Sequence, residues 1–337
     1  MPSPKPKIAF LVPGPRRSQV FAPSTLDRLH SLADVVAPEA DTAALARCLP
    51  EVLPEVDGCL TGWGTPPLTA ELLAQAPRLR IIAHSAGSIK SLIPIEAFDR
   101  GIAVCHAADI IAEAVSECTL LLLLTGLRRF HVMDRALKDG RTWAEAGRLH
   151  FGHQLAGKAV GLVGCGYVAR RVIGLLQPFG VRILVHDPYL SPERAAELGV
   201  AKVSLETLMA EADVVSNHAP ITPETRHMIG ARQLALLREG AIFVNTARAW
   251  TVDQEALLRE LQAGRIWAAL DVFEPEPLPE DSPFRKLDNV FLTPHKAGQT
   301  VETYQKQGAA MVEELARFFG GEPLRHRIAR EAYAIMA

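Results

Sequence analysis

Cysteine is scarce in this chain of 337 residues. The five cysteines are Cys48, Cys59, Cys105, Cys118 and Cys165. An odd number cannot pair completely, and no two of them stand in a C-x-x-C arrangement. The pattern argues against a disulfide scaffold and against a zinc or other metal site, and it favours a reducing compartment.

The chain also lacks an excess of charge of either sign and any long apolar run. Its 36 Lys and Arg nearly balance 38 Asp and Glu, so the formal net charge is −2. Such a balance creates no strong field to attract a nucleic acid or an anionic membrane. The apolar runs, such as the five residues 120–124, are far shorter than the ~20 residues that cross a bilayer. We therefore expect a cytoplasmic protein with neither nucleic-acid nor membrane partners.

Short apolar runs do alternate with helix-forming stretches along the whole chain. At about 150 residues per domain, the length predicts roughly two domains. In the N-terminal third the apolar runs lie at residues 8–12, 58–61, 79–83 and 102–105. Because strands that alternate with helices form parallel sheets covered on both faces, this part predicts a first α/β domain.

A second series of apolar runs follows a helical stretch at about residues 112–127. Its six predicted strands lie at residues 159–163, 181–185, 214–216, 241–244, 267–270 and 290–292. Six strands are what a full doubly wound dinucleotide fold requires. After His295 the pattern becomes helical again, through residues 311–316. The sequence therefore predicts an α/β protein with two doubly wound parallel-sheet domains.

The first strand of the second series runs into a glycine-rich loop, G-x-G-x-x-A, at residues 164–169. Gly164 permits a tight turn, Gly166 lets the backbone approach a pyrophosphate, and Ala169 allows helix and strand to pack closely. A glycine turn without a ligand is the alternative. The strand before the loop and the helix after it favour a dinucleotide-binding loop.

An acidic residue, Asp187, ends the next strand 18 residues after Ala169, near the expected spacing of ~20. Its carboxylate can accept hydrogen bonds from an adenosine ribose and would repel a 2′-phosphate. Pro188 and Tyr189 follow it, with no arginine beside them. A solvated turn acid is the alternative. We predict NAD as the cofactor, with NADH preferred over NADPH.

Three polar residues follow late strands of the second series. Arg248 follows residues 241–244, Glu276 follows 267–270, and His295 follows 290–292. Carboxyl ends of parallel strands share one edge of a sheet, where ligands bind. An arginine fork clamps a carboxylate, and an imidazole moves a proton near neutral pH. Each residue alone is commonly a surface residue, but the three together predict a keto-acid reduction site.

With these motifs in place, the chain resembles the D-isomer-specific 2-hydroxyacid dehydrogenase family. The matching segments are residues 161–169, 187–189, 218–220, 222–225, 244–248, 271–277 and 293–298, with weaker matches at 85–87 and 115–117. The resemblance implies an oxidoreductase that interconverts a small 2-keto acid and a D-2-hydroxy acid by hydride transfer with NAD.

The resemblance also implies roles for individual residues. Arg248 would bind the substrate carboxylate and carbonyl, His295 would be the general acid/base, and Glu276 would be its partner. Backbone N–H groups of Ala86, Gly87 and Ser88 would bind the substrate carboxylate. The implied cofactor-binding residues are Gly164, Gly166, Tyr167, Val168, Asp187, His218, Ala219, Pro220, Thr225, Thr246, Ala247, Asp271, Ala297 and Gly298.

The family implies a discontinuous arrangement of domains. Residues 1–110 and 299–337 would form a flavodoxin-like substrate-binding domain, and residues 111–298 a Rossmann dinucleotide-binding domain inserted into it. Homodimers formed largely through the nucleotide domains are usual in this family.

Some positions depart from the family pattern. The usual glycine after the arginine is Ala249, and the substrate loop lacks the Asp that many members carry. The particular keto acid therefore stays open. Two alternatives stay open as well: an NAD(H)-sensing binding protein of the corepressor type, and a formate-dehydrogenase-like enzyme. Formate dehydrogenases carry Gln in place of Glu276, so the glutamate favours hydroxy-acid chemistry.

Overall fold

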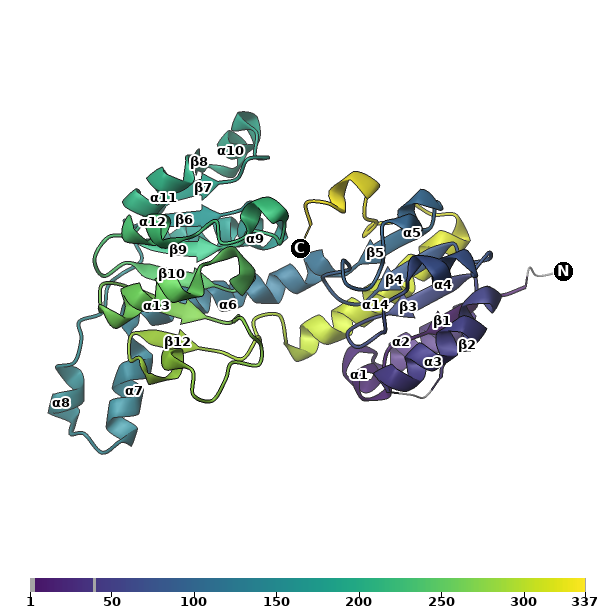
Figure 1. Ribbon diagram of the computed structural model, residues 1–337, viewed down its shortest axis with the longest axis horizontal. Helices are drawn as coiled ribbons and strands as arrows, with labels where there is room; N and C mark the ends of the chain where they lie inside the picture. Colours follow the sequence, from purple (N-terminus) through teal and green to yellow (C-terminus); the bar gives the residue numbers. More distant parts are fainter. Residues whose placement is uncertain (1–3, 39–40, 337) are drawn as a thin grey trace. The chain divides into compact units, whose positions relative to one another are not determined.

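The computed structural model describes residues 4–38 and 41–336 (Figure 1). The chain divides into two compact units. The first unit contains the residues up to Ile111 together with those from Gln299 onward, and the second unit runs from Ala112 to Gly298. Each unit is built on one parallel sheet.

The sheet of the first unit has five strands in the order β2-β1-β3-β4-β5, which is the flavodoxin-like order. The strands are β1 (Lys7–Phe10), β2 (Asp34–Val36), β3 (Gly58–Thr61), β4 (Ile81–His84) and β5 (Ala103–His106). The sequence pattern did not predict β2. This strand has only three residues, lies at the edge of the sheet and begins at an exposed aspartate, so it carries no apolar run.

Helices cover both faces of this sheet because alternate strand residues point to opposite sides. Ile8 and Phe10 pack with one group of helices, whereas Ala9 packs with the other. The first group is α1 (Gly14–Val20), α2 (Pro23–Leu32) and α14 (Val301–Gly320), and the second is α3 (Thr42–Val52), α4 (Ala70–Ala74) and α5 (Glu96–Asp99). The N-terminal and C-terminal parts of the chain therefore share one core.

The sheet of the second unit has seven strands in the order β12-β11-β10-β9-β6-β7-β8, the Rossmann order with an added edge strand. The strands are β6 (Ala159–Val163), β7 (Arg182–His186), β8 (Ala201–Lys202), β9 (Val214–Asn217), β10 (Ile242–Asn245), β11 (Trp267–Leu270) and β12 (Val290–Leu292). The six predicted strands are present. β8 was not predicted, because it consists of two exposed residues.

The helices of this unit again form two layers around a buried sheet. α11 (Leu205–Glu211), α12 (Ala231–Ala235) and α13 (Gln254–Gln262) cover one face. α6 (Ala108–Arg128) and α9 (Tyr167–Leu176) cover the other, and the remaining helices are α7 (Phe130–Lys138), α8 (Trp143–Gly147) and α10 (Pro192–Leu198). By length and composition α6 is apolar enough to cross a membrane, and half of that apolar stretch is buried inside the structure.

Candidate active site

The glycine-rich loop begins at the carboxyl end of β6, beside the point where the strand order of the sheet reverses. Gly164 has a φ of +95°, and a Cβ atom here would lie 2.8 Å from the His218 carbonyl oxygen. Glycine is therefore required both by the backbone conformation and by the close approach of the neighbouring loop. Gly166 caps α9 without a side-chain hydrogen bond, so the first N–H groups of this helix form a suitable anion site.

Asp187 lies at the end of β7 against this loop. Its carboxylate accepts hydrogen bonds from the Cys165 N–H at 2.7 Å and from the Tyr189 N–H at 2.8 Å. A pocket of about 160 Å³ adjoins it, lined by Cys165, Arg170, Asp187, Tyr189, Leu190, Ser191 and Arg194. The expectation that no arginine lies near Asp187 is wrong, because Arg170 and Arg194 line the same pocket. Arg170 comes from α9, 17 residues before Asp187, and Arg194 comes from α10, seven residues after it.

A pair of buried asparagines joins the next two loops. The Asn217 amide donates to the Asn245 side-chain oxygen at 3.1 Å and to the Thr251 hydroxyl at 2.7 Å. Asn217 accepts from the Ala219 N–H, and Asn245 accepts from the Ala247 N–H. These contacts hold residues 218–220 and 246–248 against each other. Sequence reasoning missed Asn217, Asn245 and Thr251, although the two asparagines directly end apolar strands.

The loop after β9 contains His218, Ala219 and Pro220. Burial lowers the pKa of His218 to about 4, so its ring is neutral at pH 7. Its Nε2 atom is buried and has no hydrogen-bond partner among the described residues. The Thr225 hydroxyl donates to the Pro220 carbonyl at 2.6 Å, which anchors the end of this loop.

Asp271 organises the loop that carries His295. The Asp271 side chain is fully buried at the end of β11. Its Oδ1 atom accepts from the Thr293 hydroxyl at 2.6 Å and from the Lys296 N–H at 2.8 Å, while Oδ2 accepts from the Ala297 N–H at 2.9 Å. The His295 N–H in turn donates to the Asp271 carbonyl. One carboxylate thus sets the course of the chain on both sides of His295.

His295 and Glu276 form a direct pair. Glu276 Oε2 lies 2.7 Å from His295 Nδ1, and the Phe273 N–H donates to Glu276 Oε1 at 2.9 Å. Both side chains stay accessible, His295 being 49% and Glu276 36% exposed. Because a carboxylate can only accept here, the proton lies on Nδ1.

Arg248 follows β10 and is mostly buried. Its Nη1 atom donates to the Ala247 carbonyl at 2.8 Å. Burial lowers the pKa of Arg248, and the charge of Glu276 opposes that shift. A guanidinium stays protonated in proteins, so a positive charge lies close to the His295–Glu276 pair. Thr246, two residues earlier, is held by Thr119 of α6, their hydroxyl oxygens being 2.9 Å apart.

Residues 85–88 lie in the first unit, at the carboxyl end of β4. The Ala86 carbonyl accepts from the Ala107 N–H, and the Gly87 carbonyl interacts with His106 Nδ1, each at 2.9 Å. The loop is thereby tied to β5, the neighbouring strand. Ala86 is buried, and Gly87 and Ser88 are partly exposed.

The second unit therefore brings most of the predicted site residues to one edge of its sheet. The glycine loop, Asp187 and the residues that follow β9, β10, β11 and β12 all stand at the carboxyl ends of their strands. Tyr167 and Val168 open α9, and Gly298 ends the unit. Ala86, Gly87 and Ser88 belong to the other unit.

Comparison with known proteins agrees with this architecture. The model of the D-isomer specific 2-hydroxyacid dehydrogenase NAD binding domain matches residues 120–297. A glyoxylate reductase from Korarchaeum cryptofilum is 40% identical over 77% of this chain and 78% of its own length. A hydroxypyruvate reductase from Thermotoga maritima is 36% identical over 81% of this chain and 88% of its own length.

Longer relatives and solved structures extend the comparison. A D-3-phosphoglycerate dehydrogenase from Methanocaldococcus jannaschii is 34% identical over 88% of this chain, which spans only 56% of that protein. The crystal structure of a glyoxylate reductase from Paecilomyes thermophila covers 98% of this chain and 100% of that chain, with a TM-score of 0.82 and 27% identity.

Fold and site together define a two-unit α/β oxidoreductase that binds a nicotinamide dinucleotide. More specifically, the chain belongs to the D-isomer-specific 2-hydroxyacid dehydrogenase family. Its class of reaction is the NAD-dependent interconversion of 2-hydroxy acids and 2-keto acids.

Proposed function

We propose that this protein interconverts a small 2-keto acid and the D-2-hydroxy acid, with Arg248, Glu276 and His295 as its catalytic residues. The observation that carries the proposal is the 2.7 Å pair between His295 and Glu276 at the sheet edge that also presents Arg248. Arg248 binds the substrate carboxylate and carbonyl with its planar fork. The carbonyl is thereby polarised toward attack at carbon.

Proton delivery falls to His295. Glu276 holds the proton on Nδ1, which leaves Nε2 as the ring position that donates to the substrate oxygen. After donation the ring is neutral and the hydroxy acid leaves with the proton. In the reverse direction the neutral ring accepts the hydroxyl proton. A glutamate at this position supports hydroxy-acid chemistry over the formate-dehydrogenase alternative.

The residues of the second unit fit a bound dinucleotide. Gly164 leaves no room for a side chain beside the His218 carbonyl, and the N–H groups that open α9 receive no side-chain cap, so they can bind a phosphate. The adenosine ribose would meet Asp187, while residues 246–248, Asp271 and residues 295–298 would line the nicotinamide half. When bound, NADH supplies the hydride that reduces the carbonyl carbon.

We propose NADH rather than NADPH as the preferred cofactor. The Asp187 carboxylate disfavours a 2′-phosphate by charge repulsion, and its contacts with two backbone N–H groups keep it in place. Arg170 and Arg194 line the same pocket and reduce this repulsion. Asp187→Ser should therefore raise NADPH activity strongly, by about tenfold or more, because the remaining charges then favour the phosphate.

A second copy of the chain is the proposed partner, in a cytoplasmic homodimer formed through the second unit. The stretch of residues 121–151 exposes five large apolar side chains: Leu121, Phe130, Leu137, Trp143 and Phe151. Trp143 is 85% and Phe151 is 89% exposed. A pocket of about 510 Å³ lies beside them, between α7 and the edge strand β12. Such a concentration of apolar surface is typical of an interface.

Steady-state kinetics test the catalytic assignment. NADH oxidation would be followed with glyoxylate, hydroxypyruvate, pyruvate and phenylpyruvate as substrates. His295→Ala should lower the rate by about 10²–10⁴-fold, the usual contribution of general acid–base catalysis. Arg248→Lys should reduce kcat/KM strongly, because a point charge cannot replace the bidentate fork. Wild-type kcat/KM in Arg248→Lys would overturn its role, and binding of NADH without turnover of any keto acid would favour a nucleotide-sensing protein.

A further inference from the structure

Two histidines end neighbouring strands of the first unit, directly beside the loop of residues 85–88. His84 ends β4 and His106 ends β5, and the two are paired residues in the register of these strands. Both rings are buried. Neither histidine belongs to the proposed acid–base pair of His295 and Glu276.

Hydrogen bonds from the β5 side set the direction of two peptide groups in this loop. The Ala107 N–H binds the Ala86 carbonyl, and His106 Nδ1 binds the Gly87 carbonyl, both at 2.9 Å. In a planar trans peptide the C=O of one residue and the N–H of the next point in opposite directions. The N–H groups of Gly87 and Ser88 are therefore both directed away from β5, toward a common side of the loop.

The protonation state of His106 follows from this contact. A carbonyl oxygen only accepts, so Nδ1 must carry the proton. Burial lowers the pKa of His106, so the ring is neutral at pH 7 and its donor is the Nδ1–H. His84 is neutral as well, its pKa being lowered to about 3 chiefly by burial. Its Nδ1 lies 3.0 Å from the Thr61 hydroxyl, which fixes the second ring.

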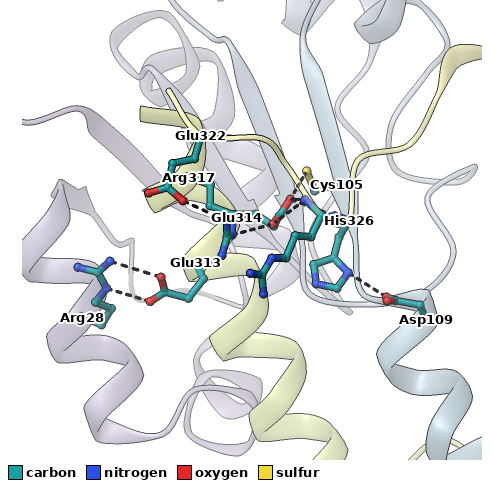
Figure 2. Close-up of polar contacts among 9 residues, drawn as sticks. Arg28, Cys105, Asp109, Glu313, Glu314, Arg317, Glu322 and His326 are labelled. Carbon is teal, nitrogen blue, oxygen red and sulfur yellow. Dashed lines mark hydrogen bonds and ion pairs between the residues drawn. The ribbon is translucent and has the colours of Figure 1, made fainter. Parts of the chain in front are cut away.

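His106 is itself held by the segment that follows α14. The His106 N–H donates to the His326 carbonyl at 3.2 Å. Figure 2 shows Glu314 of α14 at the centre of the contacts that hold this segment, where it accepts from the His326 N–H at 3.1 Å and from the Cys105 thiol at 3.4 Å. His326 Nδ1 also lies 3.1 Å from Asp109 Oδ1 in the first turn of α6. The backbone of His106 is thus held by the segment of His326, and that segment is held in turn by Glu314 and Asp109.

We propose that His106 is a positioning residue for substrate binding: its Nδ1–H fixes the Gly87 carbonyl and thereby aims the Ser88 N–H at the substrate carboxylate. The proposal rests on the proposed function and on the family resemblance, which implies that the backbone N–H groups of Ala86, Gly87 and Ser88 bind the substrate carboxylate. The loop supplies this carboxylate with a fixed pair of neutral donors, the N–H groups of Gly87 and Ser88. Loss of the His106 contact should therefore weaken keto-acid binding and leave both the chemical step and NADH binding unchanged.

A matched pair of variants tests this. His106→Leu removes the donor at similar volume, whereas His106→Asn retains an amide donor at the position of Nδ1. We expect His106→Leu to raise the KM for a keto acid, and the dissociation constant of the unreactive analogue oxamate with NADH bound, by about tenfold. kcat and the NADH dissociation constant should stay within twofold of wild type. His106→Asn should restore KM to within about threefold, and the surface control His30→Leu should match wild type.

Wild-type KM in His106→Leu, an equal loss in kcat, or failure of Asn to restore binding would each overturn the proposal. A measurement on the unaltered protein keeps the test open if His106→Leu does not fold. ¹⁵N chemical shifts of the histidine rings at pH 7 should show His106 protonated at Nδ1, and an Nε2–H tautomer would refute the contact. If wild type reduces no keto acid, the proposed function fails, while the tautomer measurement still reports on the loop.

Discussion

Replacing Asp271 by asparagine is the most informative single change in the second unit. The side chain is fully buried and accepts three hydrogen bonds, two at Oδ1 and one at Oδ2. Asparagine has the same shape but only one acceptor oxygen. If that oxygen faces Thr293 and Lys296, the amide NH₂ faces the N–H of Ala297. The buried N–H of Ala297 then faces the amide NH₂ of the new side chain, a second donor, where it had faced the acceptor Oδ2.

The magnitude follows from these contacts. A buried N–H left without an acceptor costs about 1–3 kcal/mol. The other two hydrogen bonds lose their charge assistance and about half of their strength, roughly 1 kcal/mol each. Relief from burying a charge offsets part of this. We therefore expect Asp271→Asn to lower the unfolding free energy of the second unit by about 2–4 kcal/mol, or Tm by about 5–15 °C.

Calorimetry and hydrogen exchange provide the assay. Tm would be measured by scanning calorimetry, and exchange would be followed in a peptide that covers residues 293–298. Asp288→Asn is the control, because the Asp288 side chain is 76% exposed and pairs with the half-exposed Arg135. A change within about 0.5 kcal/mol is expected there. A Tm for Asp271→Asn within 2 °C of wild type, with unchanged loop exchange, would refute the reasoning.

Three further changes test other parts of the structure. Glu276→Gln keeps the shape of the His295 partner but removes its charge. Because both side chains are partly exposed, we expect the stabilisation of the transition state to fall by about 1 kcal/mol, which lowers kcat for reduction roughly fivefold. An unchanged kcat at pH 7 would contradict the pairing. His84 and His218 have pKa values lowered to about 3 and about 4 in the folded protein. Below pH 6.5 the unfolded chain therefore binds more protons than the folded protein does. Each histidine should lower the unfolding free energy by up to about 1.4 kcal/mol per pH unit as the pH falls toward those values. Urea midpoints at pH 7.5, 6.0 and 5.0 check this, and equal midpoints would rule it out. Gly308→Ala would place Cβ in collision with the Val20 carbonyl oxygen of α1, so one of the two helices must shift. We expect a loss of at least about 2 kcal/mol in thermal unfolding, and wild-type stability would disprove the close approach.

The sequence by itself determined the class of fold and the residues of the glycine loop. Buried parallel strands are continuous apolar runs, so β6, β10 and β11 are visible as local patterns. The short edge strands β2 and β8 are not, because two or three partly exposed residues carry no such pattern. The proposed roles of Arg248, Glu276 and His295 rest on motifs that follow strands and on the family resemblance.

Only the tertiary structure decided how these residues are supported. Arg170 and Arg194 reach the neighbourhood of Asp187 from two helices, which no local spacing reveals. Asn217 meets Asn245 because parallel strands distant in sequence end at one edge of a sheet. His106 meets Gly87 for the same reason. Such contacts depend on which strands are neighbours, and strand order is set by the packing of the whole unit rather than by any local segment.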